Sequence, residues 1–238
     1  GLQIGLTEAE ATGALLCLDV TEAVIDEAIM LGYNLIISHH PLIFRGYKSI
    51  TGKDYVEQCI MKAIKNDIVI YSAHTNLDNA PEGVNFKIAE KIGLKNVQVL
   101  DVKEQSCSEE MAGAGVIGEL EMPEGETEFL KRIKKTFEVG CIKHNKLTGR
   151  EVQRVAICGG AGSFLMPLAI SQQADVFITG EIKYHDYFGH DGEILLAEIG
   201  HYESEQYTKE IFQTIIREMF PGLPVQATRV NTNPIKYM

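Results

Sequence analysis

The stretch Leu35–Pro41, LIISHHP, combines the two features that decide how this chain folds. Residues Leu35–Ser38 have the length and the β-branched content of a buried strand. Two histidines and a proline follow at once, so the strand is expected to end where His39 and His40 begin. Open α/β sheets bind their ligands beyond the carboxyl ends of their strands, and this arrangement is typical of such sheets.

Short apolar runs alternate with amphipathic segments along the rest of the chain, which predicts an α/β protein. Strands are expected at Ala14–Leu18, Leu35–Ser38, Ile68–Ser72, Val97–Val102, Gly113–Leu120, Val152–Cys158, Asp175–Thr179, Ile194–Ile199 and Val225–Val230. Apolar residues at three- and four-residue intervals predict helices at Thr21–Leu31, Asp54–Asn66, Gly83–Ile92, Glu126–Phe137, Ser163–Gln173 and Tyr202–Met219. The polar stretch 101–111 suggests a boundary near residue 105, which divides the chain into lobes 1–105 and 106–238.

The charge balance argues against nucleic acid and anionic membranes as partners. The 238 residues carry a formal net charge of −11, which repels phosphate backbones and anionic lipid. One basic run, Lys131 to Lys135, has the spacing of a solvated helix face. The apolar stretches fall short of the roughly 18 to 20 residues that a membrane span requires.

Cysteine usage predicts a reducing compartment. The five cysteines include no CxxC pair, and several lie within apolar runs, as in ALLCLDV and VAICGG. This pattern favours buried free thiols over a disulfide framework, and it predicts a cytoplasmic protein. No signal peptide is recognisable, and the abrupt opening GLQIG suggests that the natural chain starts further upstream.

Two more predicted strands deliver histidine and carboxylate at their ends. The strand Ile68–Ser72 leads into His74 and Asp78, and the strand Ile194–Ile199 leads into His201, followed by Glu205. Together with His39 and His40, these side chains are expected to converge at the ligand edge of the sheet.

The spacing of these residues suits a site for two metal ions. His201 and Glu205 lie four positions apart, so they share one face of a helix, whereas the neighbouring His39 and His40 point in different directions. A carboxylate from Asp78 or Glu205 can bridge two ions that lie roughly 3.5 to 4 Å apart. The alternatives without a metal are a pair of surface histidines, a capped turn at NLD and a solvent-exposed HxxxE pair.

Imidazole and carboxylate without thiolate select zinc, manganese, iron, nickel or cobalt over calcium or copper(I). We expect two divalent ions per chain, with zinc, iron or manganese as the foremost candidates. Two ions with open coordination positions activate water, which is hydrolytic chemistry.

A second group of residues suggests catalysis near the same edge. The segment TGEIKYHD follows the strand Asp175–Thr179, so Glu181 and His185 are predicted as general acid or base, with His74 and Tyr184 supporting the ligands. The alternative for Tyr184 and His185 is simple packing on a helix.

The glycine-rich turn GGAGSF lacks both a complete GxGxxG pattern and a Walker lysine. Gly160 and Ser163 are predicted to bind an anionic part of a substrate through backbone N–H groups and a hydroxyl at a helix N-terminus. A tight turn from strand to helix explains the glycines equally well.

Five motifs occur in order over nearly the whole chain: SHHPLIF, AHTNLDNAPEGVN, CGGAGS, TGEIKYHD and GHYESEQ. In these motifs the chain resembles the Nif-three-like family, whose bacterial members are labelled GTP cyclohydrolase I type two homologues. The resemblance implies two intertwined α/β lobes with mixed sheets and a toroidal homohexamer, built as a trimer of dimers. The length of this chain matches the short form without the inserted domain.

The resemblance also implies a dinuclear metal centre. The ligand positions of the family fall on five residues whose types all match: His39, His40, Asp78, His201 and Glu205. The implied function is a metal-dependent hydrolase acting on a nucleotide-like or pterin-like small molecule, with GTP as the labelled substrate. The alternative is a metal chaperone, a metal store or a regulatory ring without turnover.

Overall fold

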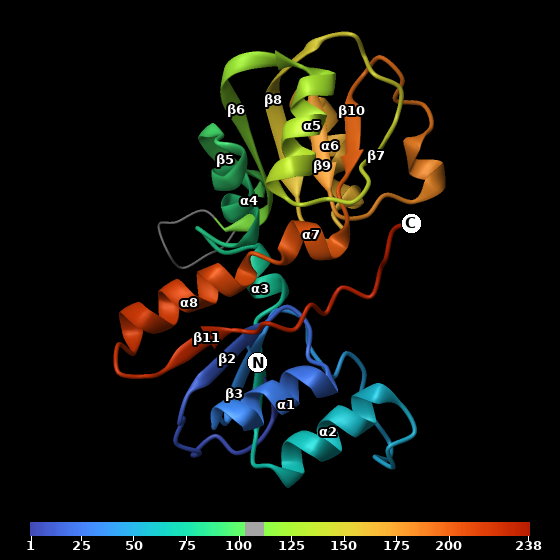
Figure 1. Ribbon diagram of the computed structural model, residues 1–238. Helices are drawn as coiled ribbons and strands as arrows, with labels where there is room; N and C mark the ends of the chain where they lie inside the picture. The colour runs from blue at the N-terminus through green and yellow to red at the C-terminus, as the bar shows by residue number, and fades with distance from the viewer. Residues whose placement is uncertain (103–111) are drawn as a thin grey trace. The chain divides into compact units, whose positions relative to one another are not determined.

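The chain passes three times between two units in the computed structural model, which describes residues 1–102 and 112–238 (Figure 1). Unit 1 comprises Gly1–Leu77 and Thr208–Lys236, and unit 2 comprises Asp78–Tyr207 with the last two residues. The boundary expected near residue 105 lies outside the described residues, and so does Cys107, so the division at that point stays a prediction.

Unit 1 is built on a five-stranded sheet in the order β1-β4-β3-β2-β11. Four neighbouring strands, β4, β3, β2 and β11, run parallel, and β1 pairs with β4 in the antiparallel direction. The strands span Leu2–Ile4 (β1), Ala14–Cys17 (β2), Leu35–Ser38 (β3), Val69–Ser72 (β4) and Val225–Ala227 (β11).

Helices cover both faces of this sheet, and strand β2 shows why. All four of its residues are fully buried; Leu15 and Cys17 pack into one cluster with the helices α1 and α2, so the alternate residues Ala14 and Leu16 face the opposite side. Helix α8 contacts β2 and β11 and completes the unit. The helices span Glu22–Leu31 (α1), Tyr55–Lys65 (α2) and Thr208–Met219 (α8).

Local capping begins and ends these helices where the sequence suggests. The Thr21 side chain accepts a hydrogen bond from Val24 N at the start of α1, and Gly32 ends the helix with a left-handed φ of 69°. Asp54 caps α2 in the same way through Glu57 N.

Unit 2 holds a six-stranded mixed sheet in the order β5-β6-β8-β9-β10-β7. The strands β8, β9 and β10 run parallel, while β5, β6 and β8 pair antiparallel, as do β10 and β7. They span Lys95–Val102 (β5), Gly113–Gly125 (β6), Lys143–His144 (β7), Glu151–Cys158 (β8), Val176–Thr179 (β9) and Leu195–Glu198 (β10).

Helices α4 and α5 contact β6 and β8, whereas residues around α6 form a separate buried cluster with the sheet (Figure 1). The longer helices span Val84–Ile92 (α4), Glu126–Thr136 (α5) and Met166–Ser171 (α6). The short helical elements are α3 (Thr75–Asp78), α7 (His201–Glu205) and the 3₁₀ turns η1 (Ser163–Leu165) and η2 (Tyr184–Tyr187).

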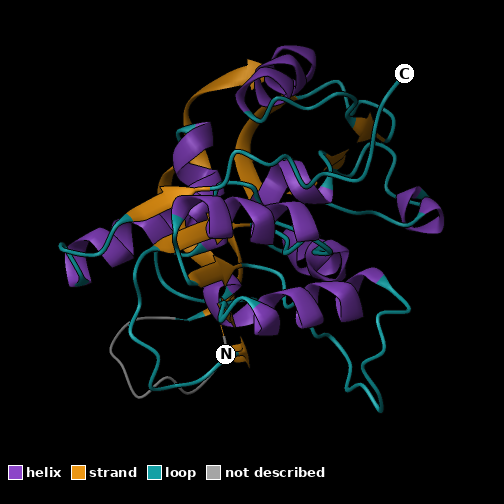
Figure 2. Ribbon diagram, turned by 60° about the horizontal axis from the view of Figure 1, so that its bottom comes forward, coloured by secondary structure: helices purple, strands orange, loops and turns teal. Residues whose placement is uncertain are grey.

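The predicted α/β class with mixed sheets is confirmed, and Figure 2 shows the helices and strands together. Every predicted strand has a counterpart. The sequence did not predict the very short strands β1 and β7 or the one-turn helix α3. The single helix expected at Tyr202–Met219 was wrong, since α7 ends at Glu205 and α8 begins at Thr208. The chain crosses from unit 2 to unit 1 at this break.

Among the described residues, none of the helices combines the length and the apolar character needed to cross a membrane. The described cysteines are free thiols, of which Cys17, Cys59 and Cys158 are buried as expected and Cys141 is exposed. Burial raises the pKa of the Cys59 thiol to about 11.

Candidate metal centre

The histidines of unit 1 gather at one edge of its sheet because three parallel strands end there. Strands β2, β3 and β4 are neighbours in register, with Leu16 opposite Ile37 and Ile37 opposite Tyr71. Their carboxyl ends therefore meet at the same edge. The residues just beyond these ends are Asp19 after β2, His39 and His40 after β3, and His74 after β4.

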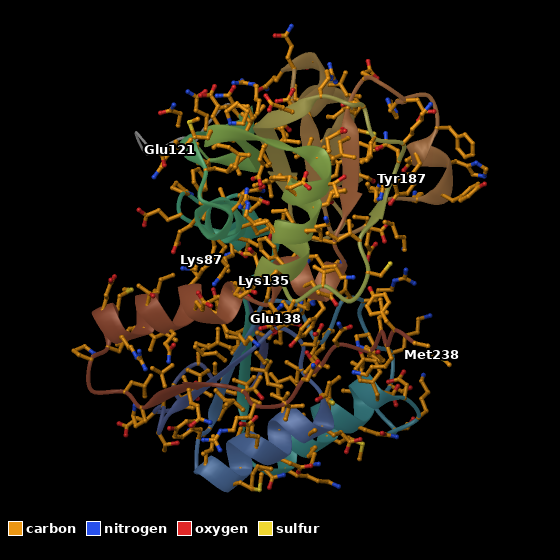
Figure 3. All side chains as sticks on the ribbon, turned by 45° about the horizontal axis from the view of Figure 1, so that its top comes forward. Lys87, Glu121, Lys135, Glu138, Tyr187 and Met238 are labelled. Atoms are coloured by element: carbon orange, nitrogen blue, oxygen red, sulfur yellow. The ribbon has the colours of Figure 1, made fainter. Side chains whose placement is uncertain are left out.

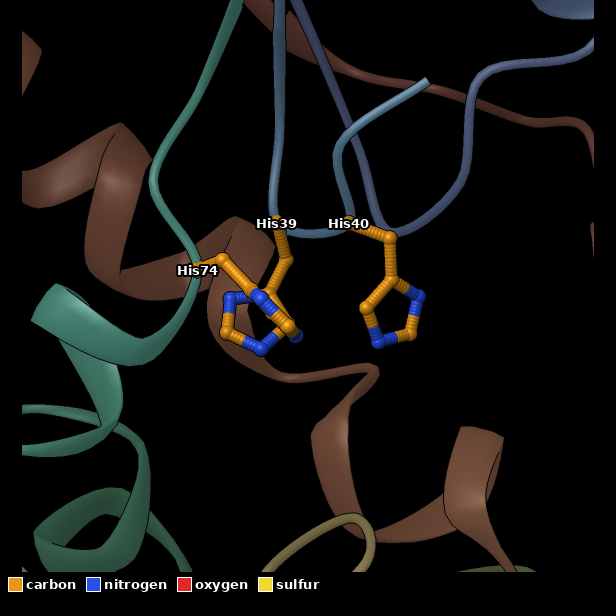
Figure 4. Close-up of side chains that lie close together, drawn as sticks. All are labelled: His39, His40 and His74. Atoms are coloured by element: carbon orange, nitrogen blue, oxygen red, sulfur yellow. The ribbon is translucent and has the colours of Figure 1, made fainter. Parts of the chain in front are cut away.

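The three imidazole rings form one cluster (Figure 4). The ring centroid of His39 lies 5.1 Å from that of His40 and 5.3 Å from that of His74, and the His40 and His74 centroids are 5.5 Å apart. One ring nitrogen of each histidine lies within 4.8 Å of those of the other two, a spacing that suits ligands of metal ions. His39 is fully buried, and the other two are half-buried.

Oxygen atoms beside Nδ1 define the tautomers of two of these rings. His39 Nδ1 lies 2.9 Å from the carbonyl oxygen of Ala73, and His40 Nδ1 lies 2.7 Å from Asp19 Oδ1. A carbonyl or an ionised carboxylate only accepts hydrogen bonds, so each Nδ1 carries the proton and each Nε2 carries the lone pair. Metal-bound histidines are typically held in this way.

Unit 2 repeats this arrangement at the ends of its own parallel strands. Strand β9 is followed by Glu181, strand β10 by His201, and strand β8 by the glycine turn that contains Gly160. Helix α7 begins at His201 and ends at Glu205, so these two side chains lie one turn apart on one face. The sequence predicted this pairing.

His201 lies between two carboxylates. Its Nδ1 is 2.7 Å from Glu181 Oε1, and its Nε2 is 3.1 Å from Glu205 Oε2. Glu205 is almost completely buried, whereas Glu181 is exposed. Hence Glu181 accepts a hydrogen bond from Nδ1–H, and Nε2 faces the buried carboxylate of Glu205.

Gly160 provides the space for Glu205. Its φ of +60° is left-handed, and a Cβ at this position would lie 2.1 Å from Glu205 Oε1. The N–H groups of Gly159, Gly160 and Gly162 donate to Asn85 Oδ1, Ser204 Oγ and Thr179 Oγ1. These three amides therefore form hydrogen bonds within the protein, as expected for a tight turn from strand to helix. Anion binding by Gly160 and Ser163 stays a prediction.

Asp78 is the last residue of α3 and the first of unit 2. Asn85 donates to its carbonyl oxygen at 3.0 Å and accepts from Gly159 N at 2.9 Å, which ties Asp78 to the glycine turn. Burial raises the pKa of the nearby Cys158 thiol to about 12, and the charges of Asp78 and Glu205 add to the effect. Without a metal ion beside it, this thiol therefore stays protonated.

Tyr184 and His185 lie on η2 in an exposed aromatic group with Phe188. The Tyr184 ring centroid is 5.2 Å from that of His185 and 5.4 Å from that of Phe188. Tyr187, which is labelled in Figure 3, anchors the segment, since its hydroxyl donates to Glu198 Oε2 at 3.0 Å. Catalysis by Glu181 and His185, and support of the ligands by Tyr184, stay predictions.

Asp19 is the functional candidate that sequence reasoning missed. The sequence pattern that identified the histidines also applies to Asp19, because in LCLDV this polar residue directly follows a buried strand. His74 was expected only to support the ligands, and the structure places its ring within the imidazole cluster itself.

The chain is similar in sequence to known proteins. The profile of the family described as Duf34/NIF3 (NGG1p interacting factor 3) matches residues 1–234. A relative from Lactococcus lactis named GTP cyclohydrolase 1 type 2 homolog is 32% identical, with 98% of this chain and 89% of the relative covered. A relative of the same name from Staphylococcus aureus is 28% identical over 345 positions, covering 100% of this chain and 93% of the relative, so it has residues without a counterpart here.

A solved structure extends the likeness to three dimensions. The crystal structure of a hypothetical protein from Staphylococcus aureus superimposes with a TM-score of 0.91 at 33% identity. The match covers 100% of this chain and 91% of that chain.

Proposed function

Since the chain belongs to the Duf34/NIF3 family, we propose that it is a metal-dependent hydrolase with a dinuclear centre. The proposed ligands are His39 and His40 from unit 1 and Asp78, His201 and Glu205 from unit 2. The observation that carries the proposal is that His39, His40 and His201 each have an oxygen atom beside Nδ1, which leaves Nε2 available for a metal ion.

The residues present fit two ions of the zinc, iron or manganese class. Neutral imidazoles and carboxylates are the donors that these metals accept, and without a metal ion beside it the buried thiol of Cys158 stays protonated.

When bound, two such ions lower the pKa of a water molecule and polarise a carbonyl, imine or phosphoryl oxygen. The protein's own residues orient the ligands and move protons. Glu181 holds the His201 ring through Nδ1, and the exposed His185 imidazole is the proposed proton carrier. Gly160 and Ser163 are the proposed contacts of the substrate, and Tyr184 on η2 is the proposed support of the ligands.

A nucleotide-like small molecule suits the surroundings of the imidazole cluster in unit 1. The Phe44 side chain is 69% exposed, and its ring centroid lies 5.5 Å from that of His74. Arg45 and Lys48 follow on the same exposed loop, and no acidic residue occurs from Pro41 to Lys53. An aromatic ring beside two cations can bind a planar, anionic compound, in keeping with the name of the curated relatives.

The test combines elemental analysis with a hydrolase screen on purified protein. We expect about two ions per chain and metal-dependent hydrolysis within a panel of GTP, other nucleoside triphosphates and phosphoesters, with formate release reporting ring opening. His201→Ala removes a ligand and is expected to reduce metal loading to at most one ion per chain and to abolish turnover. His190→Ala is the matched control, because His190 forms an exposed pair with Glu193.

The outcomes separate the candidate functions. Two bound ions without turnover of any compound would favour the metal store or chaperone. Protein that takes up neither zinc, iron nor manganese would rule out both functions.

Assembly is a separate part of the proposal. We propose a homohexamer, a trimer of dimers, in the cytoplasm, and sedimentation velocity of the metal-loaded protein measures it. A monomer at micromolar concentration would contradict the ring.

A further inference from the structure

Asp19 and Thr232 connect the C-terminal segment of unit 1 to the ring of His40. Asp19 Oδ1 lies 2.7 Å from His40 Nδ1. The other oxygen, Asp19 Oδ2, accepts a hydrogen bond of 2.7 Å from the Thr232 hydroxyl. Both carboxylate oxygens therefore have defined partners, one on the candidate ligand and one on the chain after β11.

We infer that Asp19 is a positioning residue for the metal ligand His40, and that Thr232 holds Asp19 in the orientation this requires. The inference rests on the proposed metal centre. An imidazole that donates from Nδ1 to a carboxylate is a stronger donor at Nε2, and its ring cannot turn without breaking that bond. The Thr232 hydroxyl prevents the carboxylate from rotating away, so the ring keeps one orientation.

A second carboxylate in unit 1 provides the matched control. Glu27 on α1 is buried and accepts hydrogen bonds from the Thr228 hydroxyl and from Arg229 N, the latter at 3.0 Å. This pair holds the same C-terminal segment, and among the described residues no hydrogen bond joins Glu27 to a histidine. Glu27 and Thr228 thus share the structural task of Asp19 and Thr232 without the contact to a ligand.

The experiment measures Co²⁺ affinity and the visible absorption bands of the Co²⁺-loaded protein, using full-length variants. Asp19→Asn is expected to weaken the binding of one ion about 10-fold and to shift the bands, because the His40 donor is altered. Thr232→Val should act in the same direction by a smaller factor, and Thr232→Ser should restore wild-type values because it keeps the hydroxyl. Glu27→Gln and Thr228→Val should lower the thermal midpoint and leave both the affinity and the bands unchanged.

The outcomes distinguish this inference from the function on which it rests. If the wild type binds Co²⁺ and neither Asp19→Asn nor Thr232→Val changes affinity or bands, the inference is overturned and the metal centre stands. Equal weakening by Glu27→Gln would show a purely structural role and would also overturn it. If the wild-type protein binds no metal, the proposed function is contradicted, and with it the inference that rests on it. If Asp19→Asn does not fold, the pair Thr232→Val and Thr232→Ser decides.

Discussion

The two units present their candidate ligands on the same kind of scaffold but offer different donors. In each unit, three neighbouring parallel strands end at one edge: β2, β3 and β4 in unit 1, and β8, β9 and β10 in unit 2. Unit 1 supplies three imidazoles there, whereas unit 2 supplies one imidazole, His201, with carboxylates around it. The same arrangement of parallel strands thus presents neutral donors in unit 1 and mainly anionic donors in unit 2.

The orienting carboxylates differ as well. The Asp19 side chain is 34% exposed and has its second oxygen bound by Thr232, whereas Glu181 is 60% exposed. Water can replace an exposed partner, but it cannot easily replace one held from both sides. We therefore expect His40 in unit 1 to depend more on its orienting carboxylate, Asp19, than His201 in unit 2 depends on Glu181.

The largest expected effect comes from removing one ligand in either unit. His39→Ala and Glu205→Ala should each reduce metal content from about two ions per chain to at most one, since each deletes a ligand of the proposed centre. Elemental analysis of folded protein, verified by circular dichroism, measures this. Full metal loading of either variant would show that the substituted residue is not a ligand. It would contradict the expectation that both units supply ligands.

Gly160→Ala tests how unit 2 seats its carboxylate. The left-handed backbone alone costs about 1–2 kcal/mol for a residue with a Cβ, and the new methyl group would also collide with Glu205 Oε1. We expect a lower free energy of unfolding together with weaker metal binding. Gly189→Ala is the control, because Gly189 has a φ of +87° but no atom near its Cβ position. Equal effects of the two substitutions on metal binding would contradict the role of Gly160.

Glu181→Gln separates orientation from catalysis. If Glu181 only orients His201, metal affinity should fall by less than the about 10-fold expected for Asp19→Asn, because solvent can take over at an exposed site. If Glu181 is also the general acid or base, kcat should fall about 100-fold or more at saturating metal. Metal titration and steady-state kinetics on the same preparation measure the two effects separately. Unchanged affinity and unchanged kcat would exclude both roles.

Local sequence patterns predicted most of the scaffold because each buried strand is a short apolar run with a polar residue at its end. That signal located His39, His40, Asp78, His201 and Glu205 correctly at strand ends or on the short helices that follow. The strands β1 and β7 carry too few residues for any periodicity, since they span three and two positions.

What the sequence could not predict depends on contacts between distant segments. The break between α7 and α8 coincides with a crossing between units, and no glycine or proline marks it at Gln206 or Tyr207. Asp19 became recognisable only when Thr232 and His40 were seen to lie on either side of its carboxylate. A residue that acts through another has no motif of its own.

The smallest expected effect concerns a motif that both units share away from the ligands. Buried Glu57 in unit 1 accepts hydrogen bonds from Thr51 and Lys53 N, and buried Glu126 in unit 2 accepts them from Thr148 and Gly149 N. The bond from the Thr51 backbone is the main reason why the pKa of Glu57 falls from 4.5 to about 2.

This depressed pKa predicts how the contribution of Glu57 to stability depends on pH. The folded state binds the proton less readily than the unfolded state, so the stabilisation is complete above about pH 4.5 and is lost as the pH falls towards about 2. Glu57→Gln should therefore lower the free energy of unfolding at pH 7, and its difference from wild type should shrink across that interval. Urea unfolding at several pH values measures the difference, with the exposed Glu218→Gln as control. A difference that stays constant from pH 7 to pH 2.5 would mean that hydrogen bonding to the ionised carboxylate does not hold this loop in unit 1.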